Sequence, residues 1–239
     1  MWEPVKLTEQ QIERCLNTIS PNTFHMIVGS ALVSGKGLSA VRMGEGELKL
    51  CHCLKQDGDL NEWFSKEWLV RCGVDGIDKK ELTTRVFAAI NNCDYFSPSI
   101  SGIINPIFDL YFLRSEQRYV DNFFVNFWSE EQIVQLYKQA KHVVLLHANE
   151  GTGVAFNRRA NDYLGIKATY LPLSNWVQSE SIIEQVKQLD APLILFSGGP
   201  ASKYIASEIA KTNKVVLDIG NSIDRFILWE TEQQHKNKS

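Results

Sequence analysis

The stretch His142-Val143-Val144-Leu145-Leu146-His147 decides the fold class of this chain. It is a short, continuous apolar run, which is typical of a strand buried on both faces of a parallel sheet. Two further runs of this kind occupy residues 192–197 and 214–220, and helical patterns fill residues 180–189 and 201–211 between these strands. The repeated alternation of strand and helix predicts an α/β fold with a doubly wound, mostly parallel, Rossmann-like sheet.

The first part of the chain is less regular than the rest. The pattern predicts an N-terminal helical segment over residues 1–34, an α/β domain over residues 35–229 and a polar tail that frays over residues 230–239. A short strand is expected at residues 38–42. Residues 103–128 are rich in aromatic side chains, which either fill the core or form one wall of an acceptor cleft.

The overall composition excludes several classes of protein. The chain has 239 residues, of which 44% are hydrophobic and 22% charged, and its net charge is −3. That charge argues against a nonspecific nucleic-acid binder, which carries a strong basic excess. No apolar run reaches the roughly 18 residues of a transmembrane segment, and the first residues lack the pattern of a signal peptide.

The cysteines point to a reducing compartment. Their number, five, is odd and their spacing forms no framework, so reduced thiols and a cytoplasmic location are expected. Cys51-His52-Cys53 resembles a fragment of a metal site, but no second Cys/His pair follows at the spacing of a structural zinc site.

Two carboxylates follow the first strand of the α/β domain, in Gly44-Glu45-Gly46-Glu47. On an extended or tightly turned loop, side chains two residues apart can reach one ligand, and glycine permits such a backbone. Paired oxygen ligands of this kind suit a divalent cation that also holds phosphate oxygens. The alternative for this segment is a solvated turn with both carboxylates in water.

Three more glycine-containing loops follow predicted strands, at residues 149–153, 197–203 and 218–221. Ligands of open parallel sheets bind at the carboxyl ends of strands, so these loops should share one edge. Backbone N–H groups at helix N-termini attract phosphate. The candidates for that role are Gly151, Thr152, Gly153, Gly199, Pro200 and Ser202, with Lys203 as an added cation.

The same loops weigh against two other classes of protein. No Walker pattern is present, and Gly151-Thr152-Gly153 lacks the third glycine of the dinucleotide fingerprint, which disfavours a dehydrogenase or a methyltransferase. Asp218 is equally compatible with a site role and with a structural one. His142 and His147 are more typical of packed neutral histidines than of catalytic ones.

Taken together, these motifs resemble the GT-D-fold glycosyltransferases, a family first known as a domain of unknown function. Arg42-Met43-Gly44-Glu45-Gly46-Glu47 is similar to the Asp-x-Glu segment of that family, and residues 150–154 are similar to its middle loop. Ser197-Gly198-Gly199-Pro200-Ala201 and Asp218-Ile219-Gly220-Asn221 are similar to its two later strand ends. The resemblance covers residues 35–228.

The resemblance implies a metal-dependent glycosyltransferase, hexosyltransferase-like, that takes a sugar from a nucleoside diphosphate, with a UDP-sugar as the expected donor. The acceptor would be a glycan or a glycoprotein. The implied cofactor is Mn²⁺ or Mg²⁺, and its ligands would be Glu45 and Glu47. Arg42 and Gly44 would join the donor site. The acceptor hydroxyl would need a base, for which Asp218 and Asp224 are candidates on their positions alone.

Two departures from the family pattern motivate an alternative. The first carboxylate is Glu45 where the family has aspartate, and no arginine follows Thr152. Arg158 and Arg159 are equally compatible with replacing that arginine and with a solvated helix face. The alternative is therefore a non-catalytic nucleotide-sugar-binding subunit of a glycan assembly complex.

Overall fold

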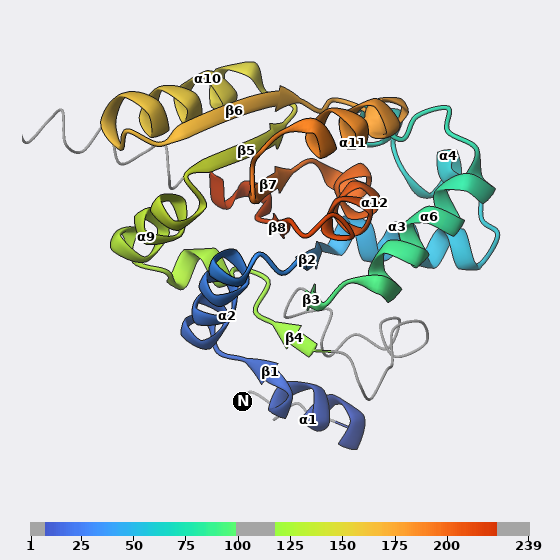
Figure 1. Cartoon of the computed structure of the whole chain (residues 1–239). Coiled ribbons are helices and arrows are strands. Elements are labelled where there is room, and N and C mark those ends of the chain that lie inside the picture. The colour runs from blue at the N-terminus through green and yellow to red at the C-terminus, as the bar shows by residue number, and fades with distance from the viewer. Residues whose placement is uncertain (1–7, 99–117, 224–239) are drawn as a thin grey trace, which may run out of the picture.

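A computed structural model describes residues 8–98 and 118–223 of the chain. Its centre is one eight-stranded sheet in the order β1-β4-β3-β2-β8-β7-β5-β6, and every pair of neighbouring strands is parallel (Figure 1). The predicted α/β class and parallel sheet are thereby confirmed. The strands are β1 (Thr18–Ile19), β2 (Leu38–Met43), β3 (Tyr95–Pro98), β4 (Arg118–Val120), β5 (His142–His147), β6 (Lys167–Pro172), β7 (Leu193–Ser197) and β8 (Val215–Asp218).

Helices cover both faces of the sheet. Several begin at a side chain that accepts a backbone N–H bond, such as Ser20, Asp78 and Ser129, because the first N–H groups of a helix have no partner within it. The helices are α1 (Glu9–Leu16), α2 (Pro21–Ser34), α3 (Glu45–Lys55), α4 (Leu60–Trp63), α5 (Lys66–Arg71), α6 (Lys79–Asn92), α9 (Glu130–Ala140), α10 (Glu150–Arg158), α11 (Ser179–Gln188) and α12 (Gly199–Ala210), with short turns η1 (Phe124–Phe127), η2 (Arg159–Tyr163), η3 (Trp176–Gln178) and η4 (Gly220–Ser222).

The central strands contribute to two hydrophobic cores. Successive side chains of a strand point to opposite faces, so Val144 and Leu146 pack with α3, α6, α11 and α12, whereas Val143 and Leu145 pack with α2 and α9. The two groups of helices lie on opposite sides of the sheet in Figure 1. Burial on both faces explains why these strands have continuous apolar sequences rather than alternating ones.

The two halves of the chain meet at the middle of the sheet. Strand β2 lies between β3 and β8, with Leu38 opposite Val215 and Ala40 opposite Leu217. Because all strands run the same way, the loops that follow β2, β5, β7 and β8 gather at one edge, as the parallel arrangement predicts.

Strands β1 and β4 are not among the predicted strands. They pair with each other through Thr18–Tyr119 and Ile19–Val120, and β4 also pairs with β3. Residues before position 34 therefore add a strand to the sheet as well as helices. The division at residues 34/35 stays a prediction, and Asp224, the tail at 230–239 and most of the aromatic-rich segment lie outside the described residues.

Across residues 8–98 and 118–223, none of the helices combines the length and apolar character that crossing a bilayer requires.

Candidate active site

A cavity of about 540 Å³ opens at the carboxyl ends of β2, β5, β7 and β8. Its volume lies within the range of small-molecule sites, roughly 300 to 1,000 Å³. The charged side chains that line it are Arg42, Glu47, Arg71, Lys203 and Asp218. Four of these five come from segments singled out by the sequence, so the structure brings the first, third and fourth glycine-containing loops together.

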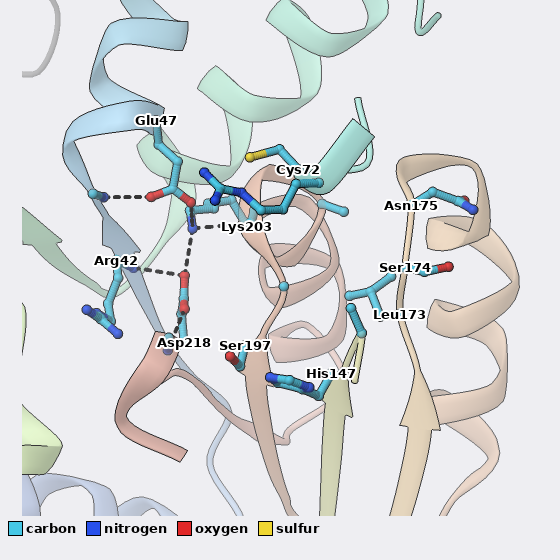
Figure 2. Close-up of a pocket in the computed structure, with 17 residues that line it drawn as sticks. Arg42, Glu47, Cys72, His147, Leu173, Ser174, Asn175, Ser197, Lys203 and Asp218 are labelled. Carbon is cyan, nitrogen blue, oxygen red and sulfur yellow. Dashed lines mark hydrogen bonds and ion pairs between the residues drawn. The ribbon is translucent and has the colours of Figure 1, made fainter. Parts of the chain in front are cut away.

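Lys203 lies between two carboxylates at the base of this cavity (Figure 2). Its Nζ donates to Oε1 of Glu47 and, at 2.9 Å, to Oδ2 of Asp218. It also donates to the backbone carbonyl of Gly199 at 3.2 Å. Only 4% of the Lys203 side chain and 3% of the Asp218 side chain are exposed, so these charges interact with little screening by solvent.

The charge of Lys203 is fixed by its partners. Burial alone would lower the pKa of Lys203, but the nearby charges of Asp218 and Glu47 outweigh this effect and raise the pKa above its usual value. The two carboxylates therefore favour the charged form of the ammonium group.

Glu47 caps the helix that it belongs to. The N–H of Gly44, the N-cap residue of α3, donates to Oε2 of Glu47 at 2.6 Å. Helix α3 begins at Glu45, so the expected bare loop is wrong and both carboxylates lie on the first helical turn. Residues two apart on a helix do not face each other. Glu45 is exposed and does not line the cavity, whereas Glu47 does.

Asp218 connects the end of β8 to the end of β2. Its Oδ2 accepts a bond from the backbone N–H of Arg42 at 3.3 Å, and its Oδ1 accepts one from Gly220 at 3.3 Å. With Lys203 as a third partner, the buried carboxylate is held from three directions. This arrangement suits a residue that organises the site more than one that takes a proton from an incoming hydroxyl.

Arg42, at the end of β2, is one of the residues that line the cavity. Its Nε donates to Oδ1 of Asn122 at 2.7 Å, and its Cζ lies 5.3 Å from the centroid of the Phe123 ring. The Nη1 atom is buried and has no hydrogen-bond partner within the part of the chain that the structure describes. A buried, unsatisfied cationic donor is costly, and an anionic ligand at this position would satisfy it.

The expected phosphate loop at residues 149–153 does not line the cavity. Asn149 caps α10 by accepting the N–H of Thr152 at 2.9 Å, and its carbonyl accepts the N–H of Gly153 at 3.1 Å. Gly153 is buried because the ring of Tyr170 covers the position that a Cβ would take. Its N–H and that of Thr152 are thus already bonded within the helix, and the glycine is explained by packing. Gly151 is exposed and lies outside the cavity lining.

The loop after β7 reaches the cavity through its glycines. Gly198 and Gly199 line it, and Gly199 has a φ of +59°, which favours glycine. Pro200 and Ser202 are buried and do not line the cavity. The Ser202 hydroxyl bonds to the Gly199 carbonyl and lies 3.4 Å from Oδ2 of Asp218, so it supports the charged cluster from behind.

Neither arginine proposed to replace the missing one of the middle loop lines the cavity. Arg158 is exposed on α10, and Arg159 is buried with its Nη2 3.3 Å from Oε1 of Glu130. The cavity instead has Arg71, at the end of α5, which the sequence analysis missed. Sequence offered no signal for it, because α5 is short and follows no strand.

His147 lines the cavity although the sequence favoured a packed role for it. Its Nδ1 accepts the N–H of Asn149 at 2.8 Å, so the neutral ring carries its proton on Nε2 and can donate a bond. Figure 2 shows His147 beside Ser197, with Ser174 and Asn175 on the side of the cavity far from Arg42. His142, by contrast, is buried against Asp190 and Thr169, as expected.

The carboxylates of the site do not fit a resident Mn²⁺ or Mg²⁺. Such an ion needs several oxygen atoms turned toward one point. Here both oxygens of Glu47 are bonded, to Gly44 and Lys203, and Asp218 is held by Lys203 as well. No group of three or more His, Cys, Asp or Glu side chains within residues 8–98 and 118–223 is placed to hold a metal.

The sequence model of the GT-D-like family, described as a GT-D fold-like domain, matches residues 20–226. This chain belongs to the GT-D-like family. The match includes α3, α12 and β8, the three elements that contribute Glu47, Lys203 and Asp218 to the charged cluster of this GT-D-like protein. The family that the motifs resemble is thus confirmed.

Solved structures agree with the GT-D-like assignment. A selenomethionine structure of domain of unknown function 1792 has a TM-score of 0.56 and 15% identity, covering 94% of this chain and 86% of that one. "A New Glycosyltransferase (DUF1792) from Streptococcus sanguinis" has a TM-score of 0.54 and 15% identity, covering 90% and 85%. At such identities the likeness shows the fold. No curated protein matches this sequence.

Proposed function

We propose that this GT-D-like protein transfers a glycosyl group from a nucleoside-diphosphate sugar to a hydroxyl group of a glycan or glycoprotein. Membership of the family supports the reaction class, and one similar structure is named a glycosyltransferase. The observation that carries the proposal is the cation-lined cavity at the carboxyl ends of the strands, in which Nη1 of Arg42 is buried without a partner among the described residues.

The arginines of the cavity suit a diphosphate. Arg42 and Arg71 both line it, and guanidinium groups bind phosphate oxygens through pairs of charge-assisted bonds. During transfer, the bond between the anomeric carbon and the β-phosphate oxygen breaks and its electron pair stays on the diphosphate. The acceptor oxygen bonds to the anomeric carbon and loses its proton. Arginines at the diphosphate stabilise the charge that develops there.

The rest of the cavity suits a sugar or a nucleoside. His147, Ser174 and Asn175 supply polar groups on the side far from Arg42 (Figure 2). Hydroxyl-rich ligands are oriented by a few such groups. UDP-sugars are the first donors to test, and the polar groups named here would contact the part of the donor beyond the diphosphate.

A screen of nucleotide sugars tests the proposal. The protein is incubated with UDP-, GDP- and CMP-linked sugars, in EDTA and separately in Mn²⁺, and release of free nucleotide is measured together with UDP binding by isothermal titration. We expect one donor to be consumed, slowly when water is the acceptor. If the screen shows neither release nor binding in either buffer, the proposal is wrong.

Paired variants show whether activity belongs to this cavity. Arg42→Ala should weaken UDP binding about tenfold or more, the effect of losing a charge-assisted bond. Arg158→Ala removes an exposed guanidinium of α10 that does not line the cavity and should leave binding unchanged. Equal effects of the two substitutions would place the binding site elsewhere.

A binding subunit without turnover is a second candidate. The observation that favours it is the engagement of Glu47 and Asp218 by Lys203, which leaves neither carboxylate open to a metal. Such a subunit would bind UDP and release no nucleotide from any donor in the same screen, whereas a transferase would do both.

A further inference from the structure

Lys203 has the surroundings that a bound cation would have. Its ammonium group carries three hydrogens, and three acceptors lie around it: Oε1 of Glu47, Oδ2 of Asp218 and the carbonyl of Gly199. The Ser202 hydroxyl is a more distant neighbour at 3.5 Å. All the donor capacity of this lysine is therefore used inside the cluster, and the lysine is 3% exposed.

We propose that Lys203 is the resident cation of this site, that it excludes a divalent metal from Glu47 and Asp218, and that the diphosphate is bound without one. The part concerning diphosphate rests on the function proposed above; the part concerning metal exclusion does not.

The ammonium group of Lys203 occupies the position between the Glu47 and Asp218 carboxylates. A metal ion could bind there only if the ammonium group moved away. Glu47 comes from α3 and Asp218 from the end of β8, and the lysine side chain connects them from α12. A divalent ion between the same oxygens would lie against a like charge in a buried setting, where repulsion is weakly screened. The Gly44 N–H also fixes the second oxygen of Glu47, so this carboxylate cannot turn to offer it.

The charge balance of the cavity is consistent with this proposal. Among the lining residues that the structure describes, the two carboxylates and the three cations, Arg42, Arg71 and Lys203, give a net charge of +1. Lys203 neutralises part of the carboxylate charge that would repel phosphate, and the two guanidinium groups supply attraction. A nucleoside diphosphate thus meets a cationic surface with no added ion.

Titration with Mn²⁺, followed by the electron paramagnetic resonance signal of the free ion, tests metal exclusion without any donor or activity. The wild-type protein should leave the signal of equimolar Mn²⁺ unchanged. Lys203→Met removes the ammonium group but keeps an unbranched side chain, so Glu47 and Asp218 become available. This variant should bind Mn²⁺ at least about tenfold more tightly than the wild type.

Lys211→Met is the matched control. Lys211 follows the same helix and pairs with Glu208 on the surface, with 61% of its side chain exposed, so this variant should behave as the wild type does. The proposal is overturned if wild-type protein removes one equivalent of Mn²⁺ from solution, or if folded Lys203→Met binds no more than the control. If Lys203→Met does not fold, the wild-type titration still tests the proposal, because removal of one equivalent of Mn²⁺ by the wild-type protein would overturn it.

A second measurement addresses the diphosphate. UDP and inorganic pyrophosphate are titrated into wild-type protein in EDTA and in Mn²⁺. We expect dissociation constants in EDTA within about twofold of those in Mn²⁺. Binding that appears only with Mn²⁺ would overturn the proposal. Absence of binding in both buffers would count against the proposed function instead, because the Mn²⁺ titration is independent of it.

Discussion

The guanidinium of Arg42 lies against Gly220 so closely that a Cβ at position 220 would overlap it. Gly220 follows β8 and has a φ of +47°, and Arg42 ends the neighbouring strand β2. The glycine therefore does two things: it permits the turn after Asp218, and it leaves room for the arginine. The position of the guanidinium is set by a residue far away in sequence.

Gly220→Ala should weaken UDP binding about tenfold by displacing Arg42 from the phosphates. Isothermal titration measures the effect. Gly165→Ala is the control, because Gly165 also has a positive φ, +63°, but nothing lies within 4 Å of its Cβ position. Both variants bear the strain of a left-handed alanine, about 1 to 2 kcal/mol. Equal losses of affinity would mean that strain, and not Arg42, is responsible.

Glu47→Gln should lower the free energy of unfolding by about 1 to 3 kcal/mol, because it removes one charged partner of a buried lysine that keeps the other. Urea denaturation measures this. Glu208→Gln breaks the surface pair with Lys211 and should cost less than about 1 kcal/mol. If Glu47→Gln is as mild as Glu208→Gln, the ion pair adds nothing to stability.

Gly153→Ala should destabilise the fold by about 1 to 3 kcal/mol, since the added methyl group overlaps the ring of Tyr170 in a packed setting. UDP affinity should stay unchanged, because this loop does not line the cavity. Gly151→Ala, at an exposed position of the same helix turn, should be nearly neutral in both measurements. If Gly153→Ala lowers the affinity for UDP and leaves the free energy of unfolding unchanged, Gly153 belongs to the binding site after all.

His142 should make stability depend on pH. Burial lowers the pKa of His142 below the usual 6.5, so the unfolded chain binds a proton that the folded protein does not. The contribution of the neutral ring is complete above pH 6.5 and is lost as the pH falls through the folded pKa. Denaturation at a series of pH values should therefore show a steeper loss below pH 6.5 in the wild type than in His142→Gln.

A variant of His52, a half-buried histidine of α3, is the control for the pH series of His142→Gln. His52→Gln should keep the slope of the wild-type protein. A slope that survives in His142→Gln would assign the pH dependence to another group.

The sheet was predictable wherever strands are buried on both faces. Val143–Leu146 and their counterparts in β7 and β8 carry the continuous apolar signal that is typical of a central strand. Strands β1 and β4, of two and three residues, are too short for any periodicity, and their pairing depends on tertiary contacts. The first positions of α3 were also missed, because glycines at positions 44 and 46 suggest a loop, whereas the reach of Glu47 to its own N-cap makes a helix.

The sequence indicated several of the residues that line the cavity, but it did not indicate how their side chains pair with one another. Arg42, Glu47, Lys203 and Asp218 were recognised as polar groups at strand ends, where parallel strands bring ligands. The ion pair of Glu47 with Lys203 joins residues 156 positions apart, and no local pattern encodes it. A glycine that makes room for Tyr170, as Gly153 does, has the same sequence signature as a glycine that makes room for phosphate, so the sequence alone does not distinguish the two roles.

The insertion of β8 between β2 and β7 has a consequence for synthesis of the chain. Until residue 215 leaves the ribosome, β2 and β7 present two open edges with no strand to join them, and open edges invite pairing with other chains. The middle of the sheet is therefore the last part that can be completed, although β2 is made early. A chain that is cut before residue 215 would lack the strand that joins the two halves of the sheet, and the facing edges of β2 and β7 would stay unpaired.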